Sequence, residues 1–102
     1  MYLVQMLLPL YDNHGRALPR EHFRQVWQEL TDRFGGVTAY LRAPAQGTWK
    51  EDDGALDRDE VVMCEVMVGA LDRGWWAHYR ESLEGRFGQQ ELVVRALPIE
   101  RL

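Results

Sequence analysis

One pattern constrains the fold of this chain more than any other feature: a strand, an amphipathic helix and a second strand, in an order that occurs twice. In the first half, residues 2–8 are apolar except for one glutamine, which is typical of a central strand covered on both faces. A helix is predicted over 19–34, opened by proline, with apolar side chains every three or four residues and Gly35 as its left-handed cap. Residues 37–42 then alternate between apolar and polar, which predicts a strand.

The second half repeats this order of elements without repeating the residues themselves. Residues 60–68 give the clearest strand of the chain, with a run of valines on one face. Asp72 is a suitable N-cap for a second helix, which is expected to run to Phe87. A last strand is predicted over 91–97, and Pro98 is expected to end it because proline cannot donate to a strand ladder.

Right-handed crossovers interleave two such units into one antiparallel sheet with both helices on the same face. The expected fold class is therefore α+β, a ferredoxin-like βαββαβ arrangement with strand order 4-1-3-2, as a single domain over residues 1–102. A chain of 102 residues with 46% hydrophobic composition can bury one core without disulfides or a metal. The lone cysteine, Cys64, cannot form an internal disulfide and is interpreted as a small buried hydrophobe.

The alternation along the strands assigns side chains to the two faces of the sheet. The expected helix-covered face contains Val4, Met6, Leu8, Val37, Ala39, Leu41, Val62, Cys64, Val66, Val68, Leu92, Val94 and Ala96. The expected open face contains Leu3, Gln5, Leu7, Thr38, Tyr40, Arg42, Val61, Met63, Glu65, Met67, Glu91, Val93 and Arg95. Seven of these thirteen open-face side chains are apolar or aromatic, and a second copy of the chain would cover them through one two-fold interface. We therefore expect a homodimer through the open face.

The polar members of the open face are the candidate ligand-binding residues: Gln5, Tyr40, Arg42, Glu65 and Arg95. If Asp53 and Gly54 centre the hairpin between the middle strands, Arg42 lies opposite Glu65 and can form a bidentate ion pair with it. Two interpretations stay open. In the first, the pair fixes the register of a dimer interface. Alternatively, the faces enclose a pocket in which Arg42 or Arg95 holds an anion and Glu65 acts as acid or base.

His14 is a second, weak candidate for catalysis, because it lies in a loop after the first strand and imidazole can act as a base near neutral pH. His22 and His78 are expected on helix surfaces, and the three histidines lack metal-ligand spacing. The sequence therefore predicts no metal site and no cofactor. Trp49, in an otherwise polar segment, is expected to pack against the end of the sheet or a second subunit.

Several classes of function are disfavoured. A net charge of −4 and a pI near 5.3 argue against nucleic acid, as does the lack of aromatic side chains on the open face of the predicted central strands. The apolar start, residues 1–11, is too short to span a membrane and lacks the basic beginning of a signal peptide. The expected location is the cytoplasm. Phosphate-loop, dinucleotide-binding and nucleophile-elbow motifs do not occur in the sequence.

A resemblance is carried by four stretches: GGVTAYLRAPAQGTWKEDDG, the strand EVMV, DRGWW and LEGRFGQQ. Together they resemble small bacterial proteins of ferredoxin-like fold, similar to the dimeric α/β-barrel group, in which two open sheets pack face to face. That group includes monooxygenases, isomerases, dismutases and non-enzymes, so the fold does not select a reaction. From the open face and its polar residues we expect a homodimer with a binding or structural role and a small anion or aromatic as ligand. The alternative is a cofactor-independent enzyme, monooxygenase- or isomerase-like, that acts on a small organic acid or aromatic.

Overall fold

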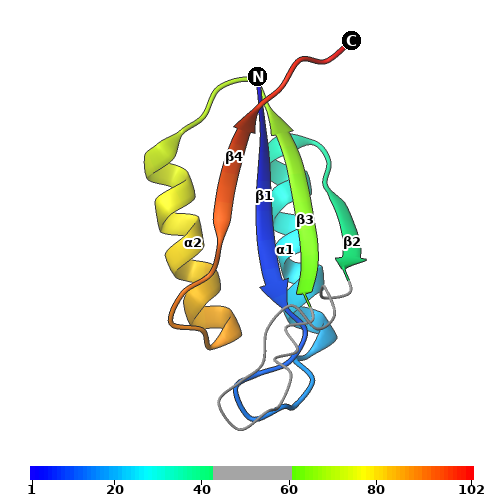
Figure 1. The fold of residues 1–102 in the computed structure, drawn as a ribbon, viewed down its shortest axis with the longest axis vertical. Coiled ribbons are helices and arrows are strands. Elements are labelled where there is room, and N and C mark those ends of the chain that lie inside the picture. The colour runs from blue at the N-terminus through cyan, green and yellow to red at the C-terminus, as the bar shows by residue number, and fades with distance from the viewer. Residues whose placement is uncertain (43–60) are drawn as a thin grey trace, which may run out of the picture.

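The structure, a computed structural model, describes residues 1–42 and 61–102, with 40–42 described by their backbone. They form an α+β arrangement of one four-stranded antiparallel sheet and two helices (Figure 1). The elements in chain order are β1 (Tyr2–Pro9), α1 (Arg20–Phe34), β2 (Thr38–Arg42), β3 (Val61–Val68), α2 (Arg73–Phe87) and β4 (Val94–Pro98). Trp49 and the predicted turn at Asp53 and Gly54 lie outside the described residues.

The strands lie in the order β2-β3-β1-β4, and each pair of neighbours is antiparallel. Read from β4, these are the same neighbours as in the predicted order 4-1-3-2. The two central strands, β1 and β3, pair along the full length of both, from Tyr2 opposite Val68 to Pro9 opposite Val61. The arrangement is compatible with the predicted ferredoxin-like βαββαβ fold.

Both helices pack against one face of the sheet and form a single core with it. From the central strands the core takes Val4, Met6, Leu8, Cys64, Val66 and Val68, and from the helices Val26, Leu30, Trp76, Tyr79, Leu83 and Phe87. The predicted helix-covered face is therefore confirmed for β1 and β3. The prediction is wrong for Ala39 and Ala96, which are exposed because they lie on the edge strands, where the helices cover the sheet less.

The helix ends follow from local sequence. Gly35 ends α1 in the left-handed region at φ 83°, where a side chain would be strained, and its N–H donates to the Thr31 carbonyl at 2.8 Å. Asp72 caps α2 as predicted, since its carboxylate accepts the Trp75 N–H at 3.1 Å. Pro19 precedes the first helical residue and does not occupy it, because its ψ of 139° is extended.

Pro98, which was expected to follow the last strand, is instead the last residue of β4, and Pro9 is likewise the last residue of β1. The Leu7 N–H donates to the Val93 carbonyl, and the Ile99 N–H donates to the Met1 carbonyl, both at 3.0 Å. In an antiparallel pair the hydrogen-bonded positions alternate. The backbone N–H and C=O groups of the odd-numbered residues of β4 therefore point to β1, and those of the even-numbered residues point away from it. The backbone nitrogen of Pro98 therefore lies on the free edge of the sheet, where its lack of an N–H costs no hydrogen bond between strands.

The register between β2 and β3 differs from the prediction. Arg42 lies opposite Val61, and Thr38 is the residue opposite Glu65. Along β2, Arg42 is four residues from Thr38, which is about 13 Å in an extended strand. The predicted ion pair between Arg42 and Glu65 is therefore wrong. The shift of four residues along β3 is even, so both residues keep the face that was expected for them.

In the part of the chain that the structure describes, neither helix combines the length and apolar composition that a bilayer crossing requires.

Candidate functional site on the open sheet face

A row of hydrogen-bonded polar side chains crosses the open face of the sheet. The Arg95 Nε donates to the Gln5 Oε1 at 2.7 Å, and the Gln5 Nε2 donates to the Glu65 Oε2 at 2.5 Å. Strand pairing places Gln5 directly opposite both partners, with Thr38 next to Glu65 on β2. We call Arg95, Gln5, Glu65 and Thr38 the polar row. Three of the predicted site residues, Gln5, Glu65 and Arg95, are thus brought together.

The Gln5 amide orders the charges of the polar row. Its oxygen faces the Arg95 guanidinium and its nitrogen faces the Glu65 carboxylate, so each end of the amide meets the charge it prefers. Arg95 and Glu65 are consequently bridged by an amide, with one strand between them. The row ends in a cation on the edge strand β4 and carries an anion on β3.

Apolar side chains lie on both sides of the polar row. On one side are Leu97, Leu3 and Met67, which oppose one another across three strands. On the other side are Val93, Leu7 and Met63. The exposed fractions of Met67, Val93 and Leu97 are 53%, 49% and 42%, whereas Met63 is buried. Leu97 was missed in the sequence, although continuing the alternation two residues beyond Arg95 would have found it.

Tyr40 and Arg42 do not belong to the polar row. By register, Tyr40 lies opposite Met63, and Arg42 lies opposite Val61 at the far end of β3. Both positions are on the open face, as expected. The set of five candidate ligand-binding residues therefore divides into a hydrogen-bonded group of three and two positions farther along β2.

A hollow of about 820 Å³ lies where the open face meets the loop after β1, lined in part by Leu7, Val93 and Asp12. The Asp12 carboxylate accepts the backbone N–H of Arg16 at 2.9 Å and that of His14 at 2.8 Å. These hydrogen bonds, the one from Arg16 first, lower the pKa of Asp12 below its usual value. Asp12 thus stabilises its own loop. The His14 side chain is exposed in that loop, which lies beyond the end of β1 and away from the polar row.

A second ionic cluster joins the two helices and was not anticipated from the sequence. Arg86 donates to both carboxylate oxygens of Glu29, at 2.8 and 2.9 Å, and the Tyr79 hydroxyl donates to Glu29 at 2.9 Å. Partial burial opposes ionisation of Glu29, but the hydrogen bonds from Arg86 and Tyr79 outweigh it and lower the pKa of Glu29. Burial, followed by the contact with Glu29, raises the pKa of Tyr79. The cluster lies between the helices, so its role is structural.

Glu29→Gln is expected to lower the free energy of unfolding by about 1 kcal/mol at neutral pH, the usual contribution of such a hydrogen-bonded pair. Because the pKa of Glu29 is lowered in the folded state, its ionised form stabilises the fold above the ordinary value of 4.5. That contribution disappears as the pH falls through the folded pKa. Urea unfolding between pH 7 and pH 3 should therefore show the difference between the two proteins shrinking toward acid. The exposed Glu81→Gln serves as control, and a difference that grows toward acid would contradict the assignment.

Cys64 and the remaining histidines do not add to the open-face site. Cys64 is fully buried, and burial, with a smaller effect of Glu65, raises the pKa of its thiol to about 12. His22 was expected on the surface, but its Nδ1 is buried and its ring meets the Phe87 ring edge-on at 5.7 Å. His78 is exposed. In residues 1–42 and 61–102, histidine, cysteine and carboxylate side chains do not gather in a group of three that could hold a metal.

The adjacent tryptophans pack between the helices. Trp76 is buried and stacks on Phe34 with ring centroids 5.3 Å apart, and the Arg33 guanidinium lies 4.2 Å from the Trp75 ring. Both indoles are thus engaged in contacts within the chain.

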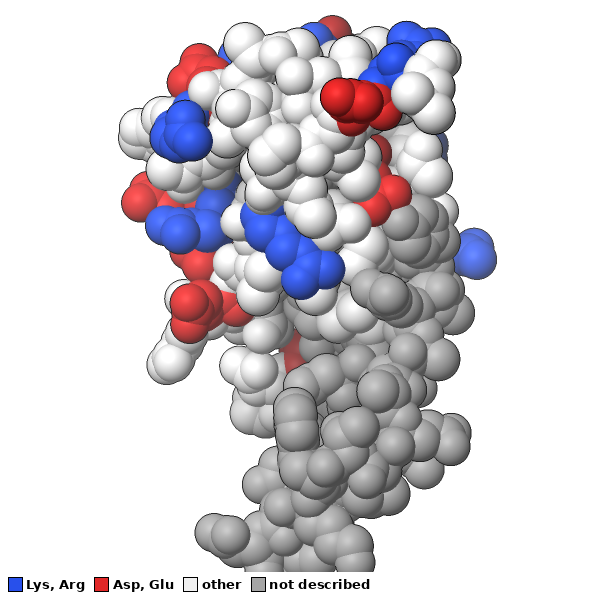
Figure 2. Space-filling model, turned by 45° about the horizontal axis from the view of Figure 1, so that its top comes forward, with Lys and Arg blue, Asp and Glu red and all other residues white. Residues whose placement is uncertain are grey.

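The described surface carries charges of both signs, interspersed with uncharged residues, in the view of Figure 2. The open face itself is an apolar surface crossed by one ordered polar row. The sequence matches no known protein-family model and no curated protein.

Proposed function

We propose that the protein acts as a homodimer in which two copies pack their open faces together, with a binding or structural role in the cytoplasm. The observation that carries this proposal is the apolar surface around the polar row, where Met67, Val93 and Leu97 are each between 42% and 53% exposed. Apolar side chains gathered on one face, with polar residues among them, are typical of an interaction surface. A second copy is the simplest cover because a two-fold interface uses the same patch twice.

The order of charges in the polar row favours one orientation of the two-fold axis. If the axis runs parallel to the strands, β4 faces β2 of the second copy and β1 faces β3. Arg95 then lies above Thr38 of the second copy, one strand away from its Glu65. Neighbouring strands are about 4.8 Å apart and packed sheets about 10 Å apart, distances that a long arginine side chain can bridge. An axis along the row would instead set Arg95 against Arg95, and like charges at an interface are unfavourable.

A small anion or aromatic bound between the two faces would be held by this same polar row and by the hollow next to it. A catalytic role for Glu65, as in the enzyme alternative, has less support. One of its carboxylate oxygens already accepts from Gln5, and the residue opposite it on β2 is a threonine. Binding thus accounts for the polar row more directly than acid–base chemistry does.

Light scattering over a dilution series tests the dimer. Near micromolar concentration the mass should be about twice the 11.9 kDa of one chain. Met67→Ala should raise the dissociation constant at least tenfold, because the lost contact occurs twice in a two-fold interface. Leu102→Ala, at an exposed apolar residue at the end of the chain, should leave it unchanged. A monomer mass at every concentration would refute the proposal.

A further inference from the structure

The outer edge of β4 carries backbone groups that face away from the sheet. The backbone groups of the odd-numbered residues of β4 form hydrogen bonds with β1, so the N–H and C=O groups of Val94 and Ala96 point away from the sheet. In the part of the chain that the structure describes, β4 is the end of the sheet on this side. Each of these two residues offers one donor and one acceptor, in the spacing that an added strand would match. Pro98, which has no N–H, limits the edge at one end.

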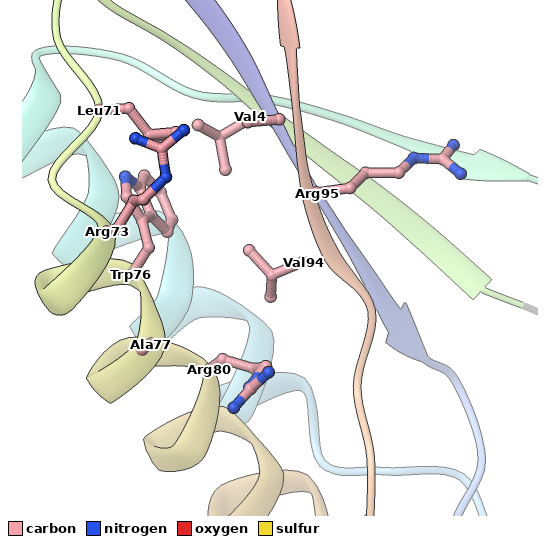
Figure 3. A pocket seen from close by; sticks show the side chains of 9 residues that line it. Val4, Leu71, Arg73, Trp76, Ala77, Arg80, Val94 and Arg95 are labelled. Atoms are coloured by element: carbon pink, nitrogen blue, oxygen red, sulfur yellow. The ribbon is translucent and has the colours of Figure 1, made fainter.

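A groove runs between this edge and α2, with a cavity of about 250 Å³ (Figure 3). Val94 points from β4 into the groove, while the Arg95 side chain points away from it toward the open face. Val4 and Trp76, both buried core residues, form the apolar floor together with Ala77. The groove therefore joins an unpaired strand edge to an apolar surface.

The α2 wall of the groove carries two arginines, Arg73 and Arg80. They are seven residues apart, which is about 10.5 Å along a helix. Two carboxylates lie nearby. Asp72 is engaged with the Trp75 N–H, and Glu84 accepts the Leu92 N–H while lying 4.0 Å from Arg80. In a chain of net charge −4, a groove with a cation toward each end favours an acidic ligand.

We propose that this groove binds an extended peptide segment with acidic side chains, which adds a strand to the β4 edge. Alternating donors and acceptors at Val94 and Ala96 match another backbone, whereas a simple anion would use only the donors. Alternate side chains of an added strand face the same side, so residues four apart lie about 13 Å from each other. This separation suits the two arginines. The expected ligand pattern is thus acidic, any, apolar, any, acidic, with the central apolar side chain on the Trp76 floor.

Fluorescence anisotropy with a labelled, end-capped Glu-Thr-Val-Thr-Glu peptide tests the proposal. The double variant Arg73→Glu/Arg80→Glu should weaken binding at least tenfold and should bind the Lys-Thr-Val-Thr-Lys peptide better than the wild type does. Arg20→Glu, at an exposed arginine on α1, is the matched control and should stay within twofold. Met67→Ala on the open face should also stay within twofold, which separates this proposal from that of the dimer.

Ala96→Pro tests the strand addition itself. It removes an N–H that points outward and leaves the ladder to β1 intact, so the fold should persist by circular dichroism while peptide binding falls at least tenfold. N-methylation of the peptide amides tests the same bonds without altering the protein and should have a similar effect. Three results would each overturn the proposal: no binding by the wild type at millimolar peptide, equal affinity for the lysine peptide, or tolerance of N-methylation. A loss of dimer mass in Ala96→Pro would also overturn it, since a second copy would then occupy the edge.

Discussion

Phe87→Ala is expected to lower the free energy of unfolding by about 3–5 kcal/mol, the usual range for removing a fully buried phenylalanine. Phe87 is 1% exposed at the last turn of α2, and its ring meets the Phe23 ring of α1 edge-on with centroids 5.2 Å apart. The same ring covers His22, so one truncation opens the contact between both helices. A domain of this size has roughly 5–15 kcal/mol of stability, so the loss would be a large part of it.

Thermal unfolding followed by circular dichroism measures this effect. For a domain near 100 residues, about 1 kcal/mol corresponds to 4–8 °C, so the Tm should fall by about 12 °C or more. His78→Ala, at an exposed position of the same helix, should change the stability by no more than about 0.5 kcal/mol. A loss of less than about 1 kcal/mol for Phe87→Ala would show that the helices pack differently at this end.

The elements and their faces could be predicted because the signals for them are local. Side chains alternate between the two faces of a strand, so residues 2–8 and 61–68 each divide into two sets, and Gln5 and Glu65 mark the set that faces away from the helices. Glycines in the left-handed region end both helices at the predicted positions. The outcome is a core that agrees with the sequence pattern along β1 and β3. At the edge strands the same pattern does not predict burial. Ala96 lies on the face of the sheet that was predicted for it, but it is exposed because the helices cover the edge strand less.

Register is different, because it depends on the turn between two strands. Assigning the turn to Asp53 and Gly54 set Arg42 against Glu65, whereas the structure pairs Arg42 with Val61. Alternation cannot detect an error of this kind, since an even shift keeps every side chain on its own face. Gln5, Glu65, Tyr40 and Arg42 therefore keep the face that was predicted for them, while the ion pair expected at its centre is wrong.

The contacts that organise the site are long-range, and a single sequence does not reveal them. Gln5 and Glu65 are separated by 60 residues, and Arg95 and Gln5 by 90. All three were candidates by composition and face, but the bridging role of the Gln5 amide required the pairing of β1 with both neighbours. Likewise, Glu29 and Arg86 lie on different helices, 57 residues apart in the sequence. Only the packing of α1 on α2 makes them a bidentate pair.

Arg95→Glu and Glu65→Arg are each expected to weaken the dimer at least a hundredfold. With the two-fold axis parallel to the strands, Arg95 of each copy lies one strand away from Glu65 of the other, within reach of its side chain, so either change places two like charges near each other at two symmetric sites. Removing one partner from a desolvated charge pair costs about 3–5 kcal/mol, and reversal adds repulsion to that loss. Arg101→Glu, at an exposed arginine near the end of the chain, should leave the dimer unchanged.

Mixing the two variants should restore the dimer. In an Arg95→Glu subunit the charged side chains of the polar row are both acidic, and in a Glu65→Arg subunit they are both basic, so a one-to-one mixture pairs opposite charges at both sites. Sedimentation velocity of each variant alone and of the mixture gives the three masses directly. The single variants also distinguish the two possible orientations of the two-fold axis. If the axis instead ran along the polar row, Arg95→Glu would exchange one pair of like charges for another, and its dissociation constant would stay near that of the wild type.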